Sequence, residues 1–133
     1  MKTILFFLIV LTAYSCMNLK DAKNYIRTTG QVQITHVQIP DTVSNMDTVQ
    51  ISAAAQAPNL CWSNIYFQLS KNIEFDNEYC LQAFGTYESY GSCPTGMVYG
   101  DTIISFQPQK TGIYIFFTDK NQQETEIDTL IVK

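Results

Sequence analysis

Apolar and polar residues alternate with a period of two along most of the chain beyond residue 30, as in the segments 48–53 and 64–70. Successive side chains of a β-strand point to opposite faces, so this period predicts strands with one buried and one exposed face. Turn residues separate the apolar segments at intervals of roughly 8–12 residues, and no amphipathic helical pattern interrupts them. We therefore expect residues 31–133 to form one all-β domain, an antiparallel β-sandwich of about seven strands, with a small β-barrel as the alternative.

Local changes in the alternation predict where single strands bend or end. The phase of the first strand, residues 32–39, shifts near His36, which predicts a β-bulge at that position. Residues 73–75 are expected to add a short strand. Residues 112–118 form the most apolar strand, and residues 124–132 are expected to return as the last strand because they are rich in β-branched side chains.

The amino terminus has the parts of a secretory signal. Lys2 supplies a positive charge, residues 4–11 form an unbroken apolar run, and small residues precede Cys16. The apolar run is shorter than the roughly 20 residues that a membrane-spanning helix needs. We therefore expect residues 1–15 to be a cleaved signal peptide rather than a buried element of the domain.

Cys16 and the residues before it resemble a bacterial lipobox. The stretch Leu11-Thr12-Ala13-Tyr14-Ser15-Cys16 is similar to the relaxed form found in Bacteroidetes lipoproteins, although Ala13 stands where Leu or Val is usual and Tyr14 is bulkier than typical. The resemblance implies that Cys16 becomes the first mature residue and carries acyl chains, such as palmitate, in the bacterial cell envelope, with the outer membrane as the expected location. Two or more acyl chains anchor a protein stably, and the polar residues 16–30 then form a flexible tether. Ordinary signal cleavage that leaves Cys16 as a thiol is the alternative.

Three cysteines follow Cys16, and an exported chain meets an oxidising compartment, so we expect one disulfide and one remaining thiol. We favour the pair Cys61–Cys93 because both cysteines lie beside turn residues. This bridge closes a loop of roughly 30 residues and stabilises the fold by about 3 kcal/mol in the chain-entropy model. Cys80 lies in an apolar stretch and is expected to pack as a small hydrophobic side chain. Cys61–Cys80 and Cys80–Cys93 are the alternative pairs.

One tyrosine resembles a feature of immunoglobulin-like domains. The segment 101–108 leads through a corner with Pro and Gly into Gly112-Ile113-Tyr114, as strand E leads into strand F of such a domain, where a tyrosine bonds back to the backbone. The resemblance implies this tyrosine-corner role for Tyr114. It also places Phe116 where antibody domains carry their second cysteine, opposite Ile51, so that apolar packing replaces the core disulfide.

The chain as a whole is similar to small Bacteroidetes lipoproteins that contain a single immunoglobulin-like domain. The residues that carry this resemblance are Pro58-Asn59-Leu60-Cys61-Trp62, the later Cys93 and the terminal hairpin. The resemblance implies a cell-envelope protein of immunoglobulin-like fold and no particular activity.

A tyrosine-rich segment is the first feature that predicts a binding surface. Residues 85–100 contain Tyr87, Tyr90 and Tyr99 among small polar residues. Tyrosine offers rigid contact area together with a hydrogen-bonding group, and this composition is typical of adaptable contact loops. Sugars also bind on aromatic faces. The alternative is a long loop held by Cys93 with half-buried tyrosines.

The strand 112–118 is the second such feature because it is apolar on both faces. If Tyr114 and Phe116 point into the core, the other apolar side chains of this strand and of the last strand point outward. The outward set is then Ile113, Ile115, Phe117, Ile127 and Ile131, which Tyr66 joins. The solvent face of an antiparallel sheet is normally polar, so this set predicts an interface. The alternative is that the tether or a long loop covers it.

Patterns for catalysis, metals and nucleic acids are lacking in the sequence. The single histidine, His36, has polar neighbours, the carboxylates of residues 74–88 cluster only along the chain, and Asp119, Asn121 and Glu124 fit no standard calcium loop. The formal net charge is −4 and no basic stripe occurs, which argues against a nucleic-acid partner. No enzyme activity, cofactor or metal is therefore expected.

The sequence thus predicts a membrane-anchored envelope lipoprotein whose domain is a non-catalytic binding or structural module for a protein or glycan partner. The alternative is an accessory subunit of a secreted or outer-membrane assembly that docks through the apolar sheet face. Exposed tyrosines around a groove would favour a glycan, and a flat apolar patch would favour docking to a protein.

Overall fold

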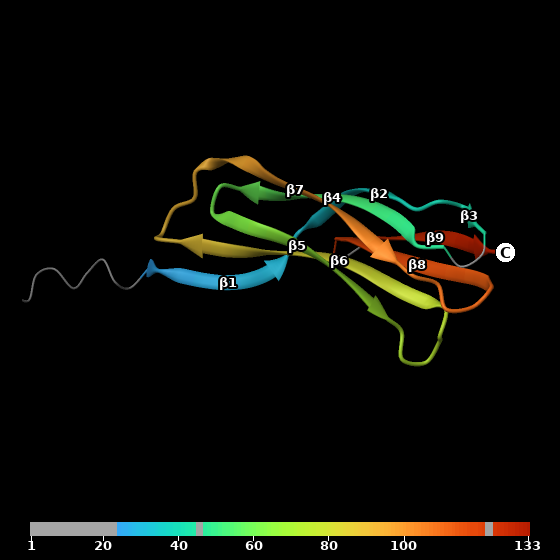
Figure 1. Ribbon diagram of the computed structural model, residues 1–133. Helices are drawn as coiled ribbons and strands as arrows, with labels where there is room; N and C mark the ends of the chain where they lie inside the picture. The colour runs from blue at the N-terminus through green and yellow to red at the C-terminus, as the bar shows by residue number, and fades with distance from the viewer. Residues whose placement is uncertain (1–23, 45–46, 122–123) are drawn as a thin grey trace, which may run out of the picture.

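The computed structural model describes residues 24–44, 47–121 and 124–133, and these residues form strands joined by turns and loops. The predicted signal peptide, Cys16 and most of the predicted tether lie outside the described residues. No helix in the described part of the chain is long and apolar enough to cross a membrane. The strands of the described part are, in chain order (Figure 1), β1 (Ile26–Gln31), β2 (Gln33–Gln38), β3 (Thr42–Val43), β4 (Val49–Asn59), β5 (Trp62–Lys71), β6 (Glu78–Ser89), β7 (Thr95–Phe106), β8 (Gly112–Asn121) and β9 (Glu124–Val132).

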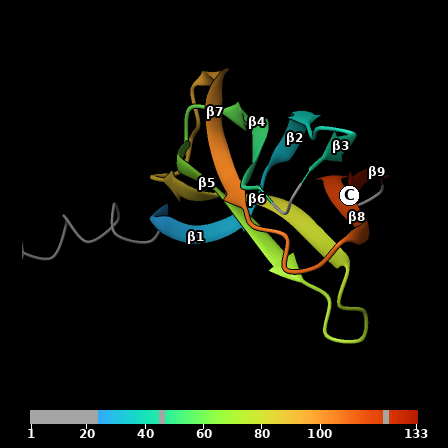
Figure 2. The same cartoon turned by 45° about the vertical axis from the view of Figure 1, so that its right-hand side comes forward.

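The strands form two sheets that pack as a sandwich (Figure 1 and Figure 2). The larger sheet has the order β1-β6-β8-β9-β3, with β5 paired to β6, and the smaller sheet has the order β2-β4-β7. Along one edge, the long strand β6 pairs with two different strands: residues 78–81 pair with β8, and residues 84–89 pair with β1. The predicted all-β sandwich is confirmed, with more strands than expected.

Two of the strand pairings are parallel, whereas the sequence predicted antiparallel sheets. Strand β6 runs parallel to β8, with Cys80 opposite Phe117, and the short β3 runs parallel to β9. A parallel pair needs a long crossover connection, and β7 supplies it by passing through the smaller sheet between β6 and β8. The alternation of residues carries no information on strand direction, so it could not predict these pairings.

The core lies between the sheets in two adjoining clusters. One cluster packs Phe116 and Leu130 of the larger sheet against Ile51 of the smaller one, and all three side chains are fully buried. The other cluster packs Ile34 and Leu81 around the alanines of β4. Burial of an apolar side chain of this size stabilises a fold by about 1.5–3 kcal/mol. Ile51 and Phe116 thus pack in one cluster from opposite sheets, as predicted.

Tyr114 makes the backbone hydrogen bonds that the sequence predicted. Its hydroxyl donates to the carbonyl oxygen of Lys110 at 2.9 Å and accepts from the backbone N–H groups of Gln109 and Lys110, each at 3.2 Å. Its ring is buried and packs edge-on against Phe106. The tyrosine therefore fastens the connection between β7 and β8 to the core.

Two local predictions have different outcomes. The register of β2 against β4 shifts between Ile34 and His36, so the predicted β-bulge is confirmed. Residues 73–75 lie in a loop and the prediction of a strand there was wrong, since Ile73 is fully exposed. The side-chain oxygen of Asn72 accepts a hydrogen bond from the backbone N–H of Glu74 at 3.0 Å, and this local bond turns the chain away from the sheet.

The folded part begins earlier than the expected boundary at residue 31. Strand β1 lies within the predicted tether and pairs with β6 from Ile26 opposite Ser89 to Gln31 opposite Phe84. Most residues of β1 are exposed, so the strand lacks the alternation of apolar residues that marks the others. Sequence periodicity could not reveal it for that reason.

We expect the substitution Tyr114→Phe to lower the free energy of unfolding by about 1–2 kcal/mol, because it removes a donor and an acceptor of backbone hydrogen bonds and keeps the buried ring. Urea unfolding followed by circular dichroism measures the difference. Tyr99→Phe is the matched control, since Tyr99 is largely exposed and its hydroxyl bonds the sulfur of Met97. Equal losses in the two variants would contradict the role assigned to Tyr114.

Candidate functional site

Strand β8 buries one row of side chains and presents the other to the outside, as the sequence predicted. Tyr114 and Phe116 are buried in the core. Side chains alternate across a strand, so Ile113, Ile115 and Phe117 point to the outer face of the larger sheet. Ile115 and Phe117 are partly exposed and Ile113 is mostly exposed.

Strand β9 extends this row of apolar side chains. Ile131 lies opposite Ile113, and Ile127 lies opposite Phe117, in antiparallel register. Opposed side chains in such a pair have Cβ atoms roughly 4.5–5.5 Å apart, so each pair is in contact, while Thr129 opposite Ile115 separates Ile127 from Ile131 on β9. We call Ile113, Ile115, Phe117, Ile127 and Ile131 the outer apolar face. Ile127 exposes 62% of its surface, so no described residue covers this part of the sheet.

Strands β5 and β6 continue the outer apolar face on its other side. Cys80 lies opposite Phe117 across the β6–β8 pair. Further along the same face, the rings of Tyr66 and Phe84 stack with centroids 5.7 Å apart, and Tyr66 is about half exposed. Tyr66 therefore lies on the same sheet face as predicted. A hydrogen bond of 3.2 Å from Gln82 to Asp119 adds a polar pair among these residues.

Cys80 is a free thiol that packs within this surface. Partial burial raises the pKa of the Cys80 thiol, because it disfavours the charged thiolate, and the negative charge of Asp119 raises this pKa further. The reactive form of a cysteine is the thiolate. Cys80 thus has the surroundings of a small hydrophobic side chain rather than of a nucleophile, as the sequence predicted.

Cys61 and Cys93 form the predicted disulfide, with their Cα atoms 5.4 Å apart. The bridge joins the turn between β4 and β5 to the connection between β6 and β7. Two backbone hydrogen bonds lie beside it, from Leu60 to Pro94 at 3.2 Å and from Glu88 to Cys61 at 2.8 Å. These contacts hold one end of the sandwich together.

The expected long tyrosine loop is mostly strand. Strand β6 extends to Ser89 and β7 begins at Thr95, so only a short connection lies between them. Tyr87 belongs to β6 and is partly buried. Its ring packs edge-on against Trp62 with centroids 5.4 Å apart, and its hydroxyl lies 3.1 Å from the sulfur of Cys93. Tyr87 therefore packs between Trp62 and the disulfide.

The two other tyrosines are exposed but lie in different surroundings. Tyr90 is 76% exposed, and its ring lies 4.8 Å from that of Tyr25 where the chain enters β1. Tyr99 is 71% exposed and lies on β7, opposite Gln56 in the smaller sheet. The three tyrosines therefore do not share one contact surface. Spacing along the sequence could not separate them, because β6 and β7 belong to different sheets.

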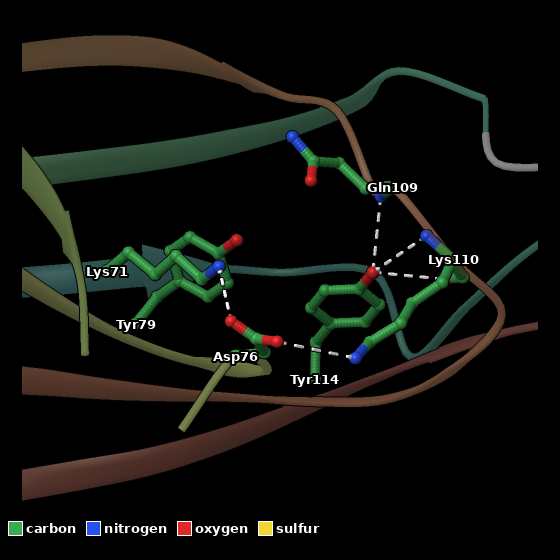
Figure 3. Close-up of a pocket in the computed structure, with 6 residues that line it drawn as sticks. All are labelled: Lys71, Asp76, Tyr79, Gln109, Lys110 and Tyr114. Carbon is green, nitrogen blue, oxygen red and sulfur yellow. Dashed lines mark hydrogen bonds and ion pairs between the residues drawn. The ribbon is translucent and has the colours of Figure 1, made fainter. Parts of the chain in front are cut away.

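A cavity of about 210 Å³ lies beside the tyrosine corner (Figure 3) and is lined by Lys71, Asp76, Tyr79, Gln109, Lys110 and Tyr114. The carboxylate of Asp76 lies 2.8 Å from the Nζ atom of Lys71 and 3.9 Å from that of Lys110. The hydrogen bond from Lys71 lowers the pKa of Asp76, and the positive charges of both lysines add to this effect. The charged groups of the cavity thus pair with one another. Spacing along the sequence could not reveal this cluster, because the segments 71–79 and 109–114 that form it are far apart in the chain.

The residues considered for catalysis and metal binding do not converge. His36 is exposed at the bulge of β2. Glu78 accepts a hydrogen bond from Asn72, whereas Glu88 accepts one from Tyr25 near the other end of β6. Across residues 24–44, 47–121 and 124–133, no group of three His, Cys, Asp or Glu side chains is placed to hold a metal ion.

Comparison of the chain with models of protein families, with curated proteins and with solved structures gives no match. The main surface features of the domain are the outer apolar face and the end of the sandwich that the disulfide Cys61–Cys93 holds together.

We expect the double substitution Cys61→Ser/Cys93→Ser to lower the free energy of unfolding by about 3–4 kcal/mol, because the bridge closes a loop between residues that are 32 positions apart. Urea unfolding under non-reducing conditions measures the loss. Cys80→Ala is the control and should cost less than about 1 kcal/mol, since it opens no cross-link and removes a single partly buried atom. A double variant as stable as the parent chain would show that the bridge does not stabilise the fold.

Proposed function

We propose that this protein is a lipid-anchored lipoprotein of the bacterial cell envelope whose immunoglobulin-like domain is a non-catalytic binding module. Acyl chains on Cys16 hold it in the membrane, and a protein partner docks on the outer apolar face. The observation that carries the proposal of a partner is the exposure of isoleucines at both ends of that face, with Ile113 at 56% and Ile127 at 62%.

The anchor is supported by the sequence at the amino terminus. A positive charge, a short apolar run and a lipobox-like stretch lead to Cys16. The presence of the disulfide Cys61–Cys93 agrees with an oxidising compartment outside the cytoplasm. These two observations are independent, since one concerns targeting and the other concerns the folded domain.

The immunoglobulin-like type is supported by the corner at Tyr114 and by the two-sheet architecture. The packing of Ile51 with Phe116 between the sheets supports it as well, because in such a domain this apolar pair would take the place of the core disulfide of antibodies. The parallel pairing of β6 with β8 departs from the antiparallel sheets of this type.

A protein partner fits the outer apolar face better than a glycan does. Aliphatic side chains dominate the face, and their burial contributes about 25 cal/mol for each Å² removed from water. Glycan recognition needs aromatic faces with polar groups around a groove, whereas the exposed Tyr90 and Tyr99 lie in different surroundings. A role as an accessory subunit of a larger assembly uses the same flat face and is the second candidate.

Mass spectrometry of the mature protein from its own membranes tests the anchor. We expect a chain that begins at Cys16 with the added mass of acyl chains, and a gain of two hydrogen atoms on reduction of the disulfide. Cys16→Ser should move the protein out of the membrane fraction, whereas Cys80→Ser should not. An unmodified chain that still carries Met1 would overturn the proposed anchor.

Photo-crosslinking in living cells tests the docking surface. A benzophenone amino acid at Ile127, the most exposed residue of the outer apolar face, should give a discrete crosslinked protein. The same amino acid at Ile103, an equally exposed isoleucine of the smaller sheet, is the control and should give none. The mass of the crosslinked product tells a second copy of this chain from a different protein. Equal crosslinking at both positions would contradict a specific partner.

A further inference from the structure

We propose that the end of the sandwich at which β1 begins rests in the surface of the lipid bilayer and thereby orients the domain on the membrane. This inference rests on the proposed acyl anchor at Cys16. The surface that carries it consists of Tyr25, Ile26, Leu60, Tyr90 and Met97, which we call the N-terminal tip. The start of β1, the end of β6, the start of β7 and the turn between β4 and β5 gather at this end, on the left of Figure 1, and the carboxyl terminus lies at the other end.

Contacts between distant segments assemble the tip. Ile26 lies opposite Ser89 in the β1–β6 pair, and the ring of Tyr25 lies 4.8 Å from that of Tyr90. On the other side, Leu60 packs so closely on Gly96 that a Cβ atom there would lie 3.0 Å from its side chain. The disulfide and its neighbouring backbone hydrogen bonds hold these segments in fixed positions.

The side chains of the tip are exposed even though they are apolar or aromatic. Their exposed fractions run from 44% for Tyr25 to 76% for Tyr90. The segments 49–70 and 89–100, which supply most of the tip, contain no charged residue. The nearby Arg27 and Glu88 carry opposite charges and lie opposite each other in the β1–β6 pair, and the carboxylate of Glu88 accepts a hydrogen bond of 2.6 Å from the hydroxyl of Tyr25.

This chemistry suits the interface between water and lipid. Tyrosine rings prefer that interface because the ring is apolar and the hydroxyl bonds to water and headgroups. Aliphatic side chains such as Leu60 and Met97 gain from burial among the acyl chains. Because the tip has no cluster of basic residues, it would not depend on anionic headgroups for its binding.

The length of chain between anchor and fold brings the tip to the membrane. Eight peptide steps separate Cys16 from Asn24, as 24 − 16 gives, and these span at most about 29 Å when fully extended. A tether of this length keeps the tip at a high effective concentration near the bilayer, so a modest gain from burial is sufficient to hold it there. Once the tip is seated, the opposite end of the sandwich points away from the membrane. That end contains Ile113 at the start of β8 and Ile131 at the end of β9.

Paramagnetic relaxation in nanodiscs tests this orientation. The mature chain from Cys16 onward, carrying Cys80→Ala, is coupled through Cys16 to a maleimide lipid in a bilayer of phosphatidylethanolamine and phosphatidylglycerol. A nitroxide placed near the top of the acyl chains then attenuates the amide signals of residues close to the bilayer. We expect attenuation at Tyr25, Leu60, Tyr90 and Met97 and full signals at Ile131.

Variants separate insertion of the tip from mere closeness to the tether. Leu60→Ser/Tyr90→Ser should reduce the attenuation of the remaining tip amides about twofold or more, because the seated state loses two apolar contacts. Ile103→Ser removes a similarly exposed apolar side chain that lies away from the tip, opposite Ser52 in the smaller sheet, and should change nothing. Unchanged attenuation in the double variant, or equal attenuation at both ends of the parent domain, would overturn the proposal. Because the coupling supplies the anchor chemically, these outcomes are separate from a failure of Cys16 to be acylated in cells, which its mass would reveal.

Discussion

Apolar packing between the two sheets, with Phe116 against Ile51 at its centre, is the interaction on which the rest of this domain depends. The rings of Tyr79 from the larger sheet and Phe106 from the smaller sheet pack on Phe116, and the ring of Tyr114 packs on Phe106. The tyrosine corner makes this packing possible, because it brings the chain from β7 in the smaller sheet back to β8 in the larger one without leaving the hydroxyl of Tyr114 unpaired. Burial without a hydrogen-bond partner would otherwise cost part of what the ring gains.

The packing of the core determines which side chains form the outer apolar face, but it does not determine that they are apolar. Since Tyr114 and Phe116 must point inward, strand geometry makes Ile113, Ile115 and Phe117 point outward. Strand geometry does not require those residues to be apolar, because polar side chains serve the solvent face of a sheet equally well. The apolar character of this face is therefore a property beyond what the fold needs, and that is the reason for placing a partner there. The disulfide Cys61–Cys93 stabilises the end of the sandwich and lies outside the packing around Phe116.

Much of the fold was predictable from the chain because burial leaves a direct trace in the sequence. The alternation of apolar residues placed β4 and β5, and the apolar and β-branched runs placed β8 and β9. The phase shift marked the bulge at His36, and the cysteines beside turns indicated the bridge. The failures have physical causes as well. Strand β1 has few buried residues, so it lacks alternation, and the loop at Ile73 contains apolar residues that a local Asn72 bond turns outward. The tyrosines of residues 85–100 separate because the chain crosses from one sheet to the other between Tyr90 and Tyr99.

The sequence by itself determined which side chains face inward, since the two-residue period of a strand converts the order of residues directly into inside and outside. On β8, which is apolar on both faces, the period grouped the isoleucines with Phe117 on one face, and the inward role expected for Tyr114 made that face the outer one. Tertiary structure alone decided which strands are neighbours, that β6 and β8 run parallel, and that Tyr25, Leu60, Tyr90 and Met97 meet at one end. The physical reason is that a period of two is the same for parallel and antiparallel pairs and for any partner strand, so only the packing of two sheets around a common core selects among them.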